Sequence, residues 1–363
     1  MGTSKGPLAG IRVIELAGLG PGPHAGMMLA DLGADVVRVQ RVPDHTATPA
    51  QLRGRTLTAA DLKNPADLAA VLALAERADV LIEGFRPGVA ERLGLGPEVV
   101  LHRNPQLVFA RMTGWGQNGP RARQAGHDIN YIGLTGALHA IGRRGERPVP
   151  PINLLGDYGG GSVFLVLGVL AALLERDRSG QGQVVDAAMV DGVMTLSHVF
   201  WTMAQLGQWS PERGTNLLDT GMAWYDTYAT ADGRHMAVGA YEPQFYAELL
   251  RVLELDPESL PPQRDRAGQE VLRKAFAEKF ATRTQREWAA LFDDVDACVT
   301  PVLTFTEAAE DAHLTARGSV IDIEGLKQPA PAPRFSRTPA PPPMPAPAVL
   351  RPIGEIWRSA PEE

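Results

Sequence analysis

The first part of the chain alternates short apolar runs with stretches of helical periodicity. Four segments rich in aliphatic and β-branched residues predict strands that are buried on both faces: residues 11–16, 34–39, 80–82 and 107–112. Between them, residues 24–32 and 67–78 carry apolar side chains at helical spacing, which predicts crossover helices. Strands that alternate with helices in this way are typical of a parallel sheet with helices on its faces.

The pattern changes in the second half of the chain. Helical patterns at 163–176 and 191–206 flank a short strand at 184–187, and residues 225–230 and 235–239 then predict a β-hairpin around the turn 231–234. Three further helices are expected, at 244–253, 271–281 and 285–291. This second pattern predicts a smaller α+β domain.

We therefore expect an α/β protein with a Rossmann-like large domain and a smaller α+β domain. The expected boundaries are a large domain at 1–187, a linker helix region at 188–217, a small domain at 218–314, a return linker at 315–328 and a C-terminal segment at 329–363. The C-terminal segment is so rich in proline that it predicts extended chain, which would pack back on the large domain.

Composition narrows the class of protein. The 363 residues are 44% hydrophobic and 21% charged, as in ordinary globular domains, and the net charge of −7 has no long single-sign runs. That balance argues against nucleic acid or a membrane surface as the main partner. The longest apolar run, 163–174, predicts a buried helix that is too short to cross a bilayer. The single cysteine, Cys298, predicts a buried, inert thiol and a cytoplasmic protein.

Two glycine-flanked motifs each place one titratable side chain where a helix is expected to start. They are Gly126-His127-Asp128 and Gly156-Asp157. A histidine and an aspartate at such positions suit a base and an acid acting on a substrate from two sides. The alternatives are a structural histidine and an aspartate that caps the helix expected from about Gly160.

Two further segments carry candidate binding residues. The glycine-rich loop 18–23 follows the first strand like a dinucleotide loop, but Pro21 and Pro23 remove backbone donors that pyrophosphate would need. Arg38 and Arg41, at the end of the second strand, suit a phosphorylated adenosine instead. Residues 84–92 combine glycines for close approach, Phe85 for stacking and two arginines for charge. The alternative is an ordinary strand-to-helix connection with solvated arginines.

Several segments together resemble the family III CoA-transferases. They are residues 7–15, 31–39, 78–88 and 180–186, with 300–303 and 333–339 extending the likeness over nearly the whole chain. Within that superfamily, Gly126-His127-Asp128 and Gly156-Asp157 resemble the α-methylacyl-CoA racemase branch.

The resemblance implies a two-base racemase that interconverts (2R)- and (2S)-2-methylacyl-CoA thioesters. His127 and Asp157 would flank C2 of the acyl group, and Glu242, which follows the predicted hairpin, would pair with His127. The backbone N–H of Asp128 would face the thioester oxygen. Branched fatty acyl, sterol side-chain and arylpropionyl groups would all present the same C2 to these bases.

The resemblance also implies how substrate and subunits are held. The contacts to the CoA nucleotide would come from Arg41, Gly84, Phe85, Arg86, Val89 and Arg92. Coenzyme A is then part of the substrate, and neither a metal nor a separate cofactor is expected. The fold implied is an interlocked homodimer, with the active site where one subunit's large domain meets the other's small domain.

Two other functions stay open at this point. In a family III CoA-transferase, Asp157 would be a nucleophile that forms anhydride and thioester intermediates, and no histidine would be needed opposite it. A non-catalytic acyl-CoA-binding protein would have no need of His127, Asp157 and Glu242 together. The presence of all three favours the racemase.

Overall fold

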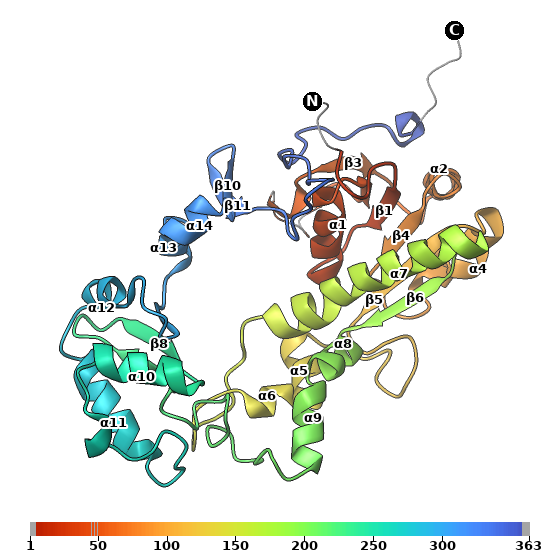
Figure 1. Ribbon diagram of the computed structural model, residues 1–363. Helices are drawn as coiled ribbons and strands as arrows, with labels where there is room; N and C mark the ends of the chain where they lie inside the picture. The colour runs from red at the N-terminus through yellow and green to blue at the C-terminus, as the bar shows by residue number, and fades with distance from the viewer. Residues whose placement is uncertain (1–4, 45, 47, 49, 358–363) are drawn as a thin grey trace. The chain divides into compact units, whose positions relative to one another are not determined.

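The computed structural model describes residues 5–357 except 45, 47 and 49 (Figure 1). The chain forms two compact units. Unit 1 contains the residues up to 135, then 151–197 and those from 312 onward, whereas unit 2 contains 136–150 and 198–311. Each unit is therefore built from segments that lie far apart in the sequence.

Unit 1 is built on a six-stranded parallel sheet with the strand order β3-β2-β1-β4-β5-β6. The strands are β1 (Arg12–Leu16), β2 (Asp35–Gln40), β3 (Arg55–Ala59), β4 (Val80–Glu83), β5 (Val108–Thr113) and β6 (Val184–Ala188). This is the order of doubly wound dinucleotide-binding sheets, so the Rossmann-like prediction is confirmed. The sequence did not predict β3, because its Arg-Thr-Leu-Thr-Ala run lacks the apolar character of its neighbours.

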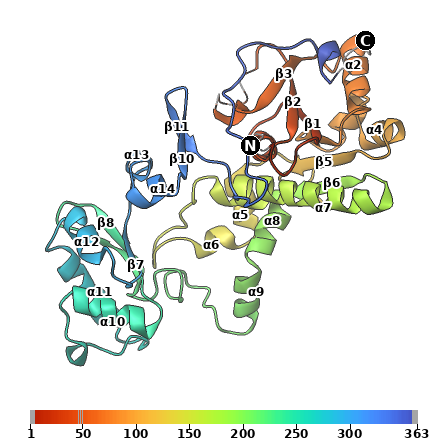
Figure 2. The same ribbon diagram turned by 45° about the horizontal axis from the view of Figure 1, so that its top comes forward.

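Helices cover both faces of this sheet (Figure 2). On one face, α1 (Pro21–Asp31) and α7 (Phe164–Ser179) pack Leu29 and Leu165 among the strand residues. On the other face, α2 (Pro65–Ala75) and α4 (Pro97–Arg103) bury Leu74 and Val100. Shorter helices carry the connections of unit 1: η1 (Ala50–Leu52), α3 (Val89–Arg92), α5 (Asp128–Leu134), α8 (Met189–Leu196), α14 (Ala312–Ala316) and η4 (Ile353–Glu355).

The helix that the sequence predicted at 163–176 begins earlier than expected. A π-helical segment, η2 (Leu154–Val163), runs directly into α7, so the helix is continuous from 154 to 179. By length and composition alone, these 26 residues could cross a membrane. Leu165, Val169 and Leu173 nevertheless pack in the core of unit 1, as expected for a helix that covers a sheet.

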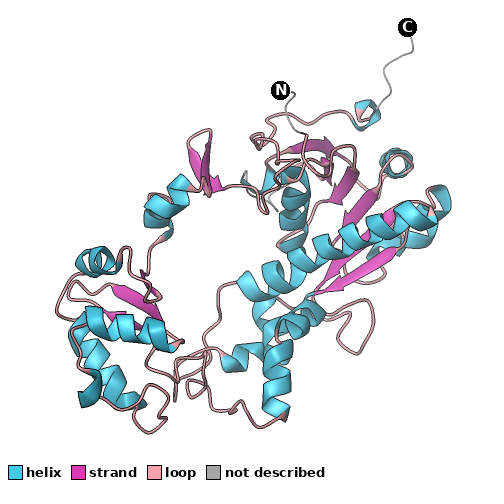
Figure 3. Cartoon of the chain, viewed as in Figure 1, coloured by secondary structure: helices cyan, strands magenta, loops and turns pink. Residues whose placement is uncertain are grey.

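Unit 2 contains the predicted hairpin and helices (Figure 3). Strands β7 (Tyr225–Ala229), β8 (His235–Gly239) and β9 (Val299–Pro301) form an antiparallel sheet. Its core joins them to α10 (Pro243–Val252), α11 (Gln269–Phe280) and α12 (Gln285–Phe292). Shorter helices in this unit are α6 (Ala137–Ala140), α9 (His198–Gln205), η3 (Pro257–Ser259) and α13 (Phe305–Ala308).

Two expectations are corrected in this part of the chain. The helix expected at 191–206 is interrupted at Ser197, so that α8 belongs to unit 1 and α9 to unit 2. Cys298 was expected to be buried, but its side chain is exposed, next to the buried Ala297. Its backbone is left-handed, with φ of 53°, directly before β9 begins at Val299.

The C-terminal segment returns to unit 1. A hairpin of β10 (Val320–Ile323) and β11 (Leu326–Pro329) precedes it, and Arg53 donates to Gln328 Oε1 and to the Pro329 carbonyl. Further along, Gly54 N donates to the Met344 carbonyl at 2.9 Å, and Ile356 is buried beside α2. Between residues 330 and 352 the chain has no helix or strand, as the proline content predicted.

Candidate active site

His127 immediately precedes α5, on a turn that is tightly packed. Its backbone is extended, and its N–H donates to Asn130 Oδ1 at 3.0 Å, which fixes the start of the helix. Gly126 is required there, because a Cβ would lie 2.7 Å from the Tyr131 ring and 3.0 Å from Trp115. The turn therefore holds the backbone of His127 firmly, while its imidazole remains exposed.

Asp157 lies within the π-helical turn η2 rather than at a helix start. The suggestion that it caps a helix from Gly160 is wrong, because η2 begins at Leu154 and Asp157 is inside it. Its Oδ2 accepts from Asn153 Nδ2 at 3.1 Å and lies 3.2 Å from where a Cβ on Gly20 would be. π-Helical segments are rare in proteins and occur frequently at functional sites.

Burial raises the pKa of Asp157 above that of an ordinary aspartate. The Asn153 hydrogen bond opposes this rise, the negative charge of Asp128 adds to it, and the positive charge of His127 opposes it. His127 and Asp157 thus lie close enough to interact electrostatically. An aspartate with a raised pKa can both give and take a proton, which is the property that an acid–base pair needs.

The Asp128 carboxylate connects the two motifs. It is 5% exposed, and its Oδ2 accepts from the backbone N–H of Gly156 at 2.6 Å and from that of Asp157 at 2.9 Å. A Cβ on Gly156 would lie 2.4 Å from this oxygen, so glycine is required at that position. The structure therefore brings His127, Asp128 and Asp157 together, and their roles in catalysis stay predictions.

Glu242 belongs to unit 2, where it precedes α10. It occupies the N-cap position, but its side chain makes no capping hydrogen bond and is exposed. Its charge acts on Cys298: partial desolvation, Asp296 and Glu242 together raise the pKa of that thiol. The Glu242 side chain therefore does not cap α10, and its pairing with His127 stays a prediction.

A pocket of about 550 Å³ opens at the carboxyl ends of β1, β2 and β4, where doubly wound sheets bind their ligands. Three of the predicted nucleotide contacts line it, namely Arg41, Phe85 and Val89. Lys63, which the sequence analysis did not single out, adds a second cation. Apolar walls and two cations suit a flat base that carries phosphate.

The other predicted nucleotide contacts lie beside this pocket and do not line it. Gly84 and Arg86 are exposed in the segment after β4, and Arg92 is the last residue of α3. Arg92 Nη1 lies 3.2 Å from where a Cβ on Gly88 would be, so its guanidinium folds back over that loop. Glu83 was missed by the sequence analysis, although its carboxylate accepts from Phe85 N at 2.6 Å and so helps to position the segment.

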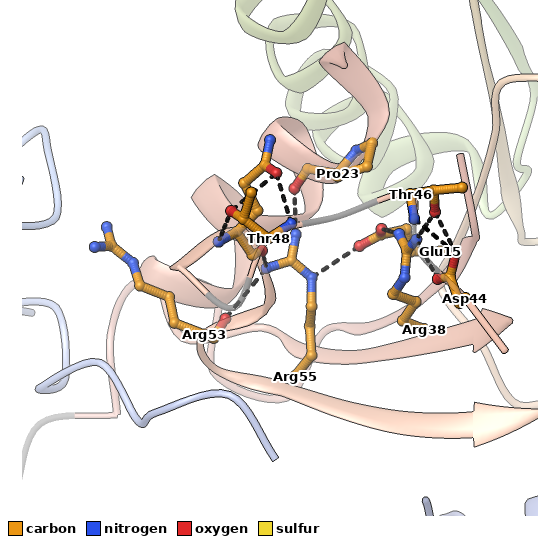
Figure 4. A network of polar contacts seen from close by, with 9 residues as sticks. Glu15, Pro23, Arg38, Asp44, Thr46, Thr48, Arg53 and Arg55 are labelled. Atoms are coloured by element: carbon orange, nitrogen blue, oxygen red, sulfur yellow. Dashed lines mark hydrogen bonds and ion pairs between the residues drawn. The ribbon is translucent and has the colours of Figure 1, made fainter. Parts of the chain in front are cut away.

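Arg38 is not a phosphate ligand, contrary to what its position in the sequence suggested. It is fully buried and forms an ion pair with Glu15, which also accepts from Arg55 Nε at 2.8 Å (Figure 4). Its second terminal nitrogen, Nη2, donates to Asp44 Oδ2 at 2.8 Å and to Thr46 Oγ1 at 2.6 Å, and both residues line the pocket. Arg38 therefore supports a pocket wall, and Arg41 remains as the exposed arginine.

No group of three or more His, Cys, Asp or Glu side chains is placed to hold a metal ion in the part of the chain that the structure describes.

Comparison with known proteins places the chain in a family. Residues 8–349 match CoA-transferase family III. The chain is 52% identical over 336 residues to the α-methylacyl-CoA racemase of Mus musculus, covering 92% of this chain and 88% of the mouse protein. It is 48% identical over 334 residues to the racemase of Homo sapiens, covering 92% and 87%. A CaiB/BaiF family protein from Brucella suis has the same fold, with a TM-score of 0.83 and 25% identity over 95% of this chain and 96% of that chain. The chain belongs to CoA-transferase family III.

Proposed function

We propose that this chain is an α-methylacyl-CoA racemase that moves a proton from one face of C2 to the other. The observation that carries the proposal is that His127 lies near enough to act electrostatically on Asp157, an aspartate whose pKa is raised by burial, in a chain about half identical to two such racemases. The substrate class is a 2-methylacyl-CoA thioester.

The reaction needs two groups that exchange roles. One removes the proton from C2, which leaves an enolate with its charge on the thioester oxygen, and the conjugate acid of the other delivers a proton to the opposite face. In one direction His127 is the base and protonated Asp157 the acid, and in the other Asp157 is the base. The backbone N–H of Asp128 lies in the first turn of α5, where it has no intrahelical acceptor, and would face the enolate oxygen.

Glu242 completes the catalytic group in this proposal. Its exposed carboxylate precedes α10 and makes no capping bond there, so it is available to accept from an imidazolium. We propose that Glu242 of the partner subunit orients His127 and stabilises its charged form, as a carboxylate behind a catalytic imidazole does in other enzymes.

The pocket at the end of the sheet would hold the CoA nucleotide. Phe85 and Val89 offer apolar surface for the adenine, and Arg41 offers charge for phosphate. Gly84 and Arg86 would contact the chain of the coenzyme beside this pocket, and Arg92 on α3 would add a second charge. Binding the nucleotide at a distance from C2 leaves the reacting carbon free to be positioned by the bases.

A homodimer would cover an apolar face that unit 1 leaves exposed. Val163, Leu167 and Leu174 lie on one side of the continuous helix and are 44%, 58% and 64% exposed. Apolar side chains at helical spacing on one face mark an interaction surface. We propose that a second copy of this chain covers it, in an interlocked dimer.

A cytoplasmic location agrees with the chemistry of the one cysteine. Cys298 is exposed and free, and its pKa is raised by partial desolvation and by the charges of Asp296 and Glu242. A thiol of this kind is stable in a reducing compartment.

The test is incubation of the purified protein with one enantiomer of a 2-methylacyl-CoA in heavy water. A racemase produces the other enantiomer, and deuterium appears at C2. In a parallel reaction, a free carboxylic acid is offered as acceptor. CoA transfer to that acid without deuterium at C2 would instead show a transferase in which Asp157 is the nucleophile.

A further inference from the structure

The Asp128 side chain has no part in the reaction steps above, yet it is the buried link between the two proposed bases. Its Oδ2 accepts from Gly156 N at 2.6 Å and from Asp157 N at 2.9 Å, and the carboxylate is 5% exposed. Hydrogen bonds to a charged acceptor in a dry environment are short and strong. Because His127 directly precedes Asp128 in the chain, these two bonds link the segment that carries His127 to the backbone that carries Asp157.

We propose that the Asp128 carboxylate is a positioning residue that sets the separation of His127 and Asp157. This proposal rests on the proposed racemase function for its catalytic meaning, but the two hydrogen bonds do not depend on it. We call Asp128 Oδ2 and the backbone N–H groups of Gly156 and Asp157 the clasp.

The surroundings show that the clasp is a close fit. A Cβ on Gly156 would be 2.4 Å from Asp128 Oδ2 and 3.2 Å from Ile132 Cγ2, so only glycine lets the η2 backbone approach this oxygen. On its other side, the η2 turn packs against α1, where Gly20 meets the Asp157 carboxylate. A π-helical turn has poorer intrinsic stability than an α-helical one, and an external anionic acceptor compensates for this.

The clasp also affects the pKa of Asp157. After burial, the negative charge of Asp128 is a further cause of the raised pKa of Asp157, and the Asn153 hydrogen bond and the charge of His127 oppose it. The charged groups that act on Asp157 are Asp128 and His127, and Asp157 in turn acts on Tyr131. Among the other ionisable groups on elements packed against η2, His24 of α1 faces Tyr158 and Ser162, and Asp191 of α8 is exposed. Asp128 is therefore the anion that raises the pKa of Asp157.

Because Asp128 Oδ1 makes no hydrogen bond in the clasp, mutation can separate the effect of Asp128 on backbone position from the effect of its charge. Oδ1 is buried without a hydrogen-bond partner among the described residues, whereas Oδ2 accepts both bonds of the clasp. In Asp128→Asn the amide oxygen can keep both bonds while the NH2 group takes the place of Oδ1. That variant removes the charge and keeps the acceptor, and Asp128→Ala removes both.

The experiment titrates Asp157 by NMR of 13C-labelled aspartate carboxylates, with Asp157→Asn to assign the signal. In Asp128→Asn we expect the titration midpoint of Asp157 to fall to lower pH. The matched control is Asp177→Asn, which makes the same change at a side chain that is 72% exposed, and there we expect no shift.

Kinetics of racemisation then separate position from charge. Asp128→Ala should lower kcat on the order of 10²-fold with little change in KM, because misplacement of a base by about 1 Å costs that much. Asp128→Asn should lose far less, and Gly156→Ala should reproduce the loss in Asp128→Ala. Wild-type kcat in Asp128→Ala would overturn the proposal, and an unchanged midpoint in Asp128→Asn would overturn the effect assigned to the Asp128 charge. If Asp128→Ala does not fold, kcat in Gly156→Ala decides instead, because the added Cβ would lie 2.4 Å from Asp128 Oδ2 and force the clasp apart. Absence of C2 exchange in the wild type would instead refute the racemase, and the titration would still test the clasp.

Discussion

Glu15 is the buried anion on which two guanidinium groups of unit 1 depend. It lies in the middle of β1, opposite Arg38 of β2 in the strand register, and it is 0% exposed. Its Oε1 accepts from Arg38, and its Oε2 accepts from Arg55 Nε at 2.8 Å (Figure 4). In Glu15→Gln a neutral amide would keep one acceptor oxygen and turn an NH2 group toward one of the two cations.

The size of the effect follows from those two bonds. Hydrogen bonds to charged groups contribute about 1.5–3 kcal/mol each, and removing one partner from a buried ion pair costs about 3–5 kcal/mol. We therefore expect Glu15→Gln to lower the free energy of unfolding by roughly 3–5 kcal/mol. At about 2–4 °C per kcal/mol for a domain of this size, the melting temperature of unit 1 should fall by roughly 6–20 °C.

Differential scanning calorimetry of the variant measures this directly. The matched control is Glu76→Gln, which removes the same carboxylate from an ion pair with Arg103 in which both side chains are 44% exposed. That pair should contribute about 0–1 kcal/mol, so the control should melt within a few degrees of the wild type. If Glu15→Gln melted as close to the wild type as the control does, the reasoning about the buried network would be refuted.

Three further predictions concern binding, pH and assembly. We expect a higher KM for the thioester, with little change in kcat, in each of Arg41→Ala, Phe85→Ala and Arg92→Ala, because each removes binding that ground and transition states share. Steady-state kinetics that show mainly a loss of kcat would contradict the nucleotide assignment. With the enantiomer that Asp157 deprotonates, the rate should fall as pH decreases through the pKa of Asp157, and burial places this acid limb above that of an ordinary aspartate. A pH–rate profile with its acid limb at or below that of an ordinary aspartate is the contrary result. Dilution should yield no folded monomer in sedimentation velocity, because interlocked subunits cannot separate without opening the chain; a monomer that grows on dilution would disprove interlocking.

Local sequence patterns were sufficient for much of the fold. The strands β1, β2, β4 and β5 are apolar runs whose neighbours in the sheet are equally apolar, so burial on both faces is visible in the sequence. The hairpin of β7 and β8 was predicted from its alternation and its Asp-Gly turn. The edge strand β3 was missed because it carries Arg55, which can be buried only by pairing with Glu15, and Glu15 lies 40 residues away in the sequence.

The candidate site, like the fold, could be predicted only in part from local sequence patterns. The glycines beside His127 and Asp157 pointed to both residues, and packing explains why those glycines are needed. The π-helical turn could not be predicted, because it depends on contacts from α5 and α1 that no local pattern contains. Arg38 was misassigned for a related reason. Its place at the end of β2 suggested a ligand, whereas Glu15 in the neighbouring strand takes up its charge.

The central claim, that His127 and Asp157 act from opposite faces of C2, is tested most directly by solvent exchange in two variants. Each of His127→Ala and Asp157→Ala keeps one base and should lose net inversion in both directions. The surviving base can still remove and return a proton on its own side, so solvent deuterium should enter one enantiomer with retained configuration.

The two variants should therefore exchange opposite enantiomers when each is incubated in heavy water with pure (2R)- and pure (2S)-2-methylacyl-CoA. The family resemblance sets the direction. Asp157→Ala, in which His127 remains, should label the 2S substrate, and His127→Ala, in which Asp157 remains, should label the 2R substrate. Exchange of the same enantiomer by both variants, or unimpaired inversion by either, would contradict the two-base account.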